Sequence, residues 1–215
     1  MKTIMLAAVS GLTSLGRPGP SPGRRATLVL LLAGGALLAG CAGPQAKPSD
    51  IMKVGSQPVL VPAAGKSLVL IHRPRAAQGY GLYTGIWDGT NFIADLGNGH
   101  SAAYLCDPGV HYFLNRSVER VGVVESHLLP DHVYDLRLGT CGAWIASFQI
   151  EPVQKEDRKR EKLPQWTREH LWVERNDQAR KHELERTAEV ELILKDFVSG
   201  AKQDRLRHLA PEDHR

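Results

Sequence analysis

The sequence predicts a mainly β fold, a small antiparallel β-sandwich of about seven to eight strands followed by a C-terminal helical segment. Between residues 66 and 152, short runs of aliphatic and aromatic residues recur roughly every 8–12 residues, which is typical of sandwiches and barrels. Turn-forming glycine, proline, asparagine and aspartate separate these runs. No helical period lies between them, so a sheet built from βαβ units is not favoured.

Residues 1–40 are typical of a bacterial lipoprotein signal peptide. The basic pair Arg24-Arg25 precedes an apolar run over residues 26–40, and the next residue is Cys41, after Leu-Ala-Gly. This run is about 15 residues long, short of the roughly 20 that a transmembrane helix needs, so a permanent membrane-spanning anchor is the less favoured alternative. We therefore expect cleavage before Cys41 and lipid attachment to its sulfur.

The net charge of +4 is carried by this leader. Four of the 27 basic residues and none of the 23 acidic residues lie in residues 1–40, so cleavage leaves 23 of each sign. A neutral mature chain lacks the basic surface that binding to nucleic acid requires. The expected partners are therefore the membrane, through the N-terminal lipid, and an envelope protein, with no nucleic acid.

Residues 41–65 contain prolines and glycines without periodicity, which predicts a flexible tether ahead of the fold. Ala42 follows the lipobox cysteine where inner-membrane retention usually places aspartate. We therefore expect the protein in the cell envelope, at the outer membrane and facing the periplasm.

Two cysteines remain once Cys41 is lipidated. Cys106 and Cys141 form an even pair in an oxidising compartment, so a disulfide between them is one hypothesis. Two separate buried thiols are the other, because free cysteine is among the most buried side chains. Sequence alone does not decide between them, since the distance between the two Cα atoms determines whether a disulfide forms.

The β-sandwich domain is predicted over residues 66–152, with turns at Asp88-Gly89 and Asp107-Pro108-Gly109. Aspartate followed by glycine between two apolar runs is a strong hairpin signal, because both central positions of the turn favour positive φ. The expected strands cover residues 67–72, 80–87, 91–96, 100–106, 110–114, 118–124, 132–138 and 144–150.

Residues 153–215 form a charged, mainly helical segment, with 15 basic and 14 acidic side chains. Pro164 is expected to interrupt it. A helix is predicted from Asn176 or Asp177, both good N-caps, to about Ser199. Its expected apolar stripe, which would pack on the β-domain, consists of Leu184, Ala188, Ile193 or Leu194, and Phe197.

Residues 67–152 resemble a family of bacterial lipoproteins of unknown function with a small β-sandwich domain. The matching pieces are Arg73-Pro74 after the first strand, the Ile86–Thr90 hairpin, the Leu96–Gly99 turn, the Asp107–His111 step and Tyr134. Such strand–turn–strand modules look like the add-on domains of carboxypeptidase regulatory regions and of PEGA-type surface-layer repeats. The resemblance implies a β-sandwich and no established activity.

Candidate chemistry is sparse. His127, Asp131 and His132 offer two imidazoles and a carboxylate in one loop, but zinc sites usually draw three or four ligands at defined spacing. The sequence contains no Gly-x-Ser-x-Gly nucleophile motif. Trp166 and Trp172 lie in a polar segment and could form a ligand-binding face, although aromatic residues more often belong to the core.

These observations favour a lipid-anchored, non-enzymatic binding or assembly module of the cell envelope, with no catalytic residue, metal or cofactor. The alternative is an envelope enzyme or metal-binding protein that uses the loop containing His127, Asp131 and His132.

Overall fold

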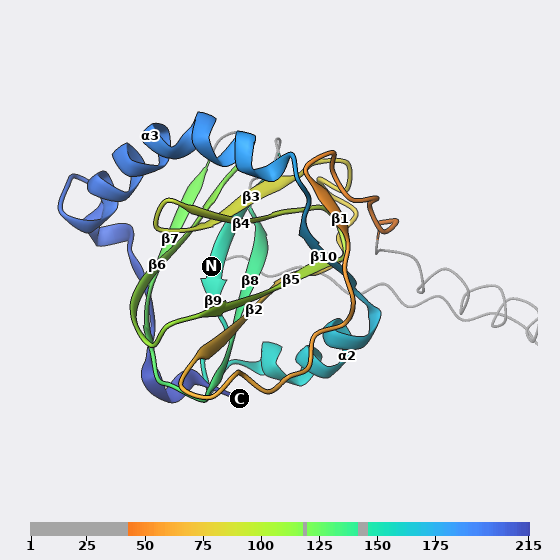
Figure 1. The fold of residues 1–215 in the computed structure, drawn as a ribbon, viewed down its shortest axis with the longest axis horizontal. Helices are drawn as coiled ribbons and strands as arrows, with labels where there is room; N and C mark the ends of the chain where they lie inside the picture. The colour runs from red at the N-terminus through yellow and green to blue at the C-terminus, as the bar shows by residue number, and fades with distance from the viewer. Residues whose placement is uncertain (1–42, 118–119, 142–145) are drawn as a thin grey trace, which may run out of the picture. The chain divides into compact units, whose positions relative to one another are not determined.

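The computed structural model describes residues 43–117, 120–141 and 146–215 (Figure 1). The predicted signal peptide and Cys41 lie outside the described residues, as do residues 118–119 and 144–145 of two predicted strands. The described residues form a mainly β fold with a helix near the C-terminus, which confirms the predicted fold class.

Eleven strands lie in the described residues, more than the seven or eight that the sequence pattern predicts. They are β1 (Met52–Val54), β2 (Ser67–Arg73), β3 (Thr84–Asp88), β4 (Asn91–Leu96), β5 (His100–Cys106), β6 (Gly109–Arg116), β7 (Val121–Leu128), β8 (Val133–Cys141), β9 (Ser147–Pro152), β10 (Leu171–Arg175) and β11 (Arg207–Leu209). The helices are α2 (Leu163–Glu169), α3 (Ala179–Val198) and the 3₁₀ turns η2 (Arg158–Lys162), η3 (Gln203–Arg205) and η4 (Pro211–Asp213).

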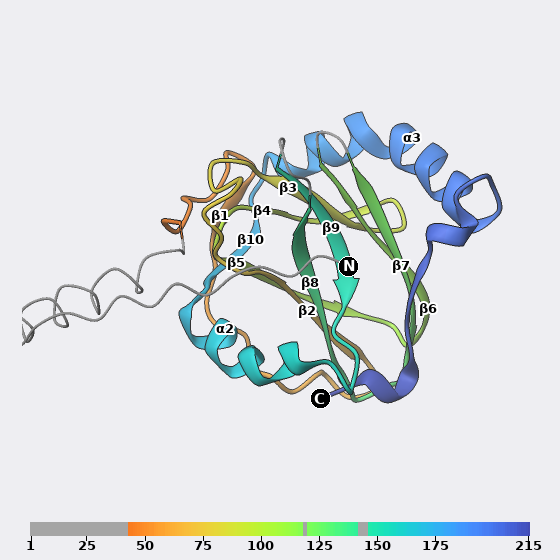
Figure 2. The same ribbon diagram turned by 180° about the vertical axis from the view of Figure 1, so that it is seen from behind.

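The strands form a six-stranded sheet of order β1-β10-β5-β2-β8-β9 and a five-stranded sheet of order β11-β7-β6-β3-β4. Figure 2 shows β2, β8 and β9 side by side, with α2 near β2. Apolar side chains of both sheets, such as Ile71 and Leu136 from one and Phe113 and Val124 from the other, share one core. The pairs β2–β8, β5–β10 and β7–β11 are parallel, so the predicted purely antiparallel pairing is wrong.

The segment over residues 153–215 belongs to the sandwich and is not a separate appendage. Its strand β10 lies between β1 and β5, and its strand β11 forms the edge of the five-stranded sheet. Pro164 begins α2 instead of interrupting a helix, because proline is tolerated in the first helical turn, where its missing N–H is not needed. The predicted boundary at residue 152 is therefore wrong.

The predicted tether is also wrong over residues 43–55. Strand β1 pairs with β10, and the N–H of Ala46 donates to the carbonyl of Asn98 at 2.9 Å. Residues 43–55 thus lie on the fold, although their proline and glycine content is typical of a linker.

Helix α3 runs over nearly the predicted residues, and the second half of its expected apolar stripe packs on the core. Phe197 is buried, and Ile193 and Leu194 contact the core, as predicted. The first half of the stripe is wrong, because Leu184 is 63% exposed and Ala188 is exposed as well. Glu183 is buried, and it accepts hydrogen bonds from Phe92 N–H and Arg175. The prediction fails in the first half of the helix because a buried, fully paired glutamate has the same sequence signal as a solvated one.

No helix in the described part of the chain is both long and apolar enough to cross a membrane.

Cys106 and Cys141 are free thiols, so the hypothesis of a disulfide between them is wrong. Cys106 lies opposite Ser67 at the start of β2. Strand β8 runs parallel to β2, and Cys141 lies at its far end, eight residues beyond Val133, the partner of Leu68. At about 3.3 Å per residue this separation is far beyond the roughly 7 Å that a disulfide allows. Burial raises the pKa of the Cys106 thiol to about 12.

Candidate functional site

The end of β2 places two consecutive polar side chains inside the molecule. All seven residues of β2 are buried, and neighbouring residues point to opposite faces of the sheet. Arg73 points into the core, where its guanidinium lies 4.0 Å from the centre of the Phe148 ring. His72 points to the other face, beneath α2, where its ring lies 5.7 Å from that of Trp166.

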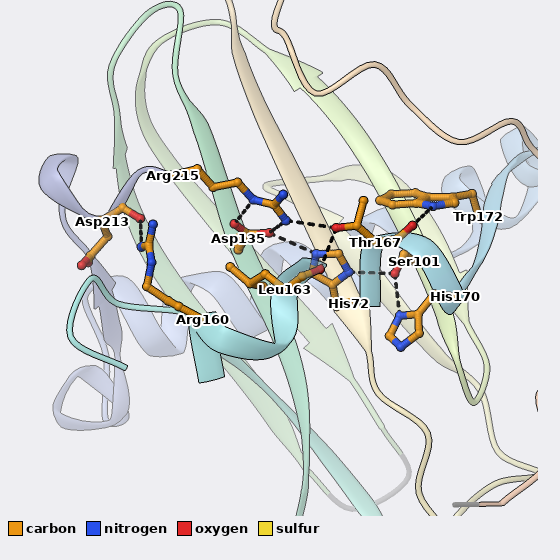
Figure 3. Close-up of polar contacts among 10 residues, drawn as sticks. All are labelled: His72, Ser101, Asp135, Arg160, Leu163, Thr167, His170, Trp172, Asp213 and Arg215. Carbon is orange, nitrogen blue, oxygen red and sulfur yellow. Dashed lines mark hydrogen bonds and ion pairs between the residues drawn. The ribbon is translucent and has the colours of Figure 1, made fainter. Parts of the chain in front are cut away.

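His72 is the centre of a buried polar array (Figure 3). Its Nε2 lies 3.0 Å from Oδ1 of Asp135 on β8, and its Nδ1 lies 2.8 Å from Oγ of Ser101 on β5. The same Ser101 oxygen lies 2.8 Å from Nδ1 of His170, which follows α2. The three contacts join residues that are 29, 63 and 69 positions apart in the sequence. The pairing of β2 with β5 and β8 brings His72 next to Ser101 and Asp135.

Asp135 contributes the negative charge of this array. Arg215 donates two hydrogen bonds to its carboxylate, at 2.6 and 2.7 Å, and His72 contacts the same group. Burial alone would raise the pKa of Asp135, but the hydrogen bonds from Arg215 and His72 lower it below its ordinary value. Asp135 is therefore an ionised carboxylate paired with a guanidinium inside the fold.

The partners determine where the protons lie. The carboxylate of Asp135 only accepts, so Nε2 of His72 carries a proton. In the neutral form of His72, Nδ1 then accepts the hydroxyl proton of Ser101. The oxygen of Ser101 in turn accepts the N–H of Nδ1 of His170. Both ring nitrogens of His72, the hydroxyl of Ser101 and both carboxylate oxygens of Asp135 thus have partners.

Helix α2 and the residues after β11 cover the array. The hydroxyl of Thr167 donates to the carbonyl of Leu163 and lies 3.4 Å from Nη2 of Arg215. Arg160 donates to the carbonyls of Asp213 and His214, which holds that last stretch against η2 and α2. Hydrogen bonds thus join the C-terminal residues to both η2 and α2.

Trp166 and Trp172 do not form a ligand-binding face. Both are buried, and both rings lie within 6 Å of the His72 ring. The indole N–H of Trp172 donates to the carbonyl of Thr167. These two tryptophans enclose the array, because α2 places Trp166 and β10 places Trp172 against the ring of His72.

The order Asp135–His72–Ser101 is that of the residues in a serine hydrolase triad, but the ring nitrogens are reversed, since Nε2 faces the carboxylate and Nδ1 faces the hydroxyl. In such enzymes the serine oxygen has to reach a substrate carbonyl. Ser101 and His72 are both 0% exposed, so no substrate reaches the hydroxyl in this structure. The geometry supports a structural role, in which a fully paired polar array attaches α2 to the sheet.

The alternative site at His127, Asp131 and His132 is not assembled. His127 pairs with Glu125, His132 contacts the carbonyl of Pro130, and Asp131 accepts from Gly65 N–H. No group of three or more histidine, cysteine, aspartate or glutamate side chains is arranged to hold a metal ion in residues 43–117, 120–141 and 146–215. The three side chains serve separate local contacts.

A surface hollow of about 350 Å³ lies beside η2, and ion pairs link charged side chains in its wall. Glu151 in its wall forms ion pairs with Arg137, Lys159 and Arg207. Burial would raise the pKa of Glu151, but Arg207 and the other two cations lower it. The charges of this hollow thus satisfy each other.

Sequence reasoning missed the array completely. His72 lies inside a strongly apolar strand, and His170 has no metal or catalytic spacing to another histidine. The available signals were the polar residues at buried strand positions, Ser101 and Asp135, since a buried polar side chain needs a partner.

Comparisons with protein-family models, with curated proteins and with solved structures found no match. The resemblance to a lipoprotein family therefore stays a prediction.

The Ser101→Ala variant tests the structural role of the array. It leaves Nδ1 of His72 and Nδ1 of His170 buried without a partner, which we expect to lower the free energy of unfolding by about 1–3 kcal/mol. Urea denaturation measures this. The exposed Ser56→Ala variant is the matched control and should be near neutral. Equal stability of the two variants would contradict the structural role.

The array also predicts a pH dependence. Burial, with smaller contributions from His72, Arg75 and His100, lowers the pKa of His170 from 6.5 to about 3. The unfolded chain therefore binds a proton at His170 that the folded chain does not, and stability falls as the pH drops below 6.5. The expected slope from this group is at most about 1.4 kcal/mol per pH unit.

Urea denaturation of the wild type and of His170→Gln at pH 7, 6 and 5 measures this slope. The variant should show a shallower loss of stability between pH 7 and 5. Identical slopes for the two proteins would show that His170 does not titrate as its burial requires.

Proposed function

We propose that the protein is a lipid-anchored lipoprotein of the bacterial cell envelope, whose β-sandwich is a non-enzymatic binding or assembly module. The observation that carries the proposal is the sequence Leu-Ala-Gly-Cys at residues 38–41, behind a basic pair and an apolar run. Such a motif supports lipid attachment at Cys41 and, with Ala42 next to it, sorting to the outer membrane.

The folded part is consistent with export and anchoring. Residues 41–215 carry equal numbers of basic and acidic side chains, and residues 43–55, close behind the motif in sequence, lie on the fold. The domain thus carries no net charge, which suits protein contacts better than binding to nucleic acid.

The buried array supports a binding module over a hydrolase. Ser101 is sealed beneath α2, and its hydroxyl is held between two histidines. A fluorophosphonate probe, which reacts with activated serines, should not label Ser101 in the intact protein. Labelling that is lost in Ser101→Ala would contradict the non-enzymatic proposal.

Lipid attachment is tested by growing cells that express the full chain with an alkyne analogue of palmitate. We expect the wild type to be labelled and the Cys41→Ser variant to lose the label and remain unprocessed, because the thiol is the acceptor of the lipid. Cys141→Ser is the matched control, since this thiol is partly exposed and should not affect labelling. Equal labelling of Cys41→Ser and wild type would overturn the proposal.

A further inference from the structure

The chain joins the fold within two residues of the predicted lipid. Gly43 packs directly on the loop between β2 and β3, so that a Cβ at this position would lie 2.6 Å from the carbonyl oxygen of Ala76 and 3.1 Å from Cβ of Tyr80. Only Ala42 separates Cys41 from Gly43 in the sequence, and two residues span at most about 7 Å of chain. A lipid on Cys41 therefore emerges beside this loop.

The residues after Gly43 are fixed to the turn between β4 and β5. Asn98 Nδ2 donates to the carbonyl of Pro44, and its Oδ1 accepts from Ala76 N–H, so one side chain ties the entering chain to the β2–β3 loop. Nε2 of His100 lies 2.8 Å from the carbonyl of Ala46. Because that carbonyl only accepts, His100 donates to it.

The β2–β3 loop is fixed from below by Arg73. Its guanidinium donates to the carbonyls of Gly79 at 2.7 Å and Leu82 at 2.6 Å, and also to the carbonyl of Leu96. Tyr83 donates its hydroxyl proton to the carbonyl of Lys47. The loop and the entering chain thus form one surface, and Figure 1 shows them next to each other at the start of the described chain.

This surface has the composition of a membrane interface. Tyr80, Leu82 and Tyr83 are exposed on it, and Arg75 and Lys47 add positive charge. Residues 43–48 and 74–83 contain no aspartate or glutamate. Tyrosines are enriched at the level of lipid headgroups, and basic side chains are attracted to anionic phospholipids.

We propose that this surface, which we call the anchor face, rests in the phospholipid headgroup layer and sets the orientation of the domain. The inference rests on the proposed lipid attachment at Cys41. The short link leaves no room for the domain to move away, and the exposed tyrosines and leucine gain apolar contact with the lipid. The domain then presents its opposite end, at the start of β2, to the periplasm.

Site-specific photo-crosslinking tests the anchor face in the full chain in cells. Leu82 and Leu129 are matched positions, because their side chains are 36% and 40% exposed. Each backbone carbonyl accepts a hydrogen bond from a residue of β2. Arg73, at the end of the strand, donates to Leu82, and Ser67, at its start, donates to Leu129. Benzoylphenylalanine replaces each leucine in turn, and phospholipid adducts are measured after irradiation. We expect several-fold more adduct at Leu82 than at Leu129.

Palmitate-analogue labelling of the same cells separates the two proposals. With Cys41 labelled, equal adducts at Leu82 and Leu129 overturn the anchor face alone. Without label on Cys41, the lipoprotein proposal fails and the anchor face fails with it.

A flexible spacer tests the role of the short link. About 20 Gly-Ser residues inserted between Ala42 and Gly43 would allow an average displacement of roughly 25 Å. We expect the adduct at Leu82 to fall toward the level at Leu129. An unchanged adduct would overturn the claim that the short link holds the face on the membrane.

Discussion

The burial of two consecutive polar side chains at the end of β2 is the constraint on which the rest of the structure depends. A buried polar group that lacks a hydrogen bond destabilises the fold by several kcal/mol. Several such groups together would cost roughly as much as the whole free energy of unfolding. Arg73 therefore donates hydrogen bonds to the carbonyls of Gly79, Leu82 and Leu96. Burial lowers the pKa of Arg73 to about 10. On the opposite face of the sheet, His72 is hydrogen-bonded to Asp135 and Ser101.

Each of the two side chains organises one side of the domain. Around His72, the array holds α2 and the residues after β11 over the sheet, and this side is closed. On the other face, Arg73 fixes the β2–β3 loop by donating to its carbonyls, and residues 43–48 contact this loop and the neighbouring turn. This side carries the exposed residues Tyr80 and Leu82. One strand end thus connects the stability of the domain with its proposed placement on a membrane.

The sequence predicts the strands β2 to β9, because their apolar residues alternate or run continuously, as in β2. It does not predict β1, β10 and β11, which are three to five residues long and lie among charged residues. It assigns residues 43–48 to a tether, because their contacts are made by backbone carbonyls and by the side chain of Asn98, which composition does not reveal. The array is hidden for a similar reason, since its members come from four separate segments.

The central claim is that the folded domain lies directly on the membrane, with no tether between them. Neutron reflectometry of the lipidated protein on a supported phospholipid bilayer measures this directly. The account predicts a protein layer that begins in the headgroup region, without an intervening layer of water. A water-filled gap of roughly 25 Å, as a flexible arm of about 20 residues would give, would contradict it.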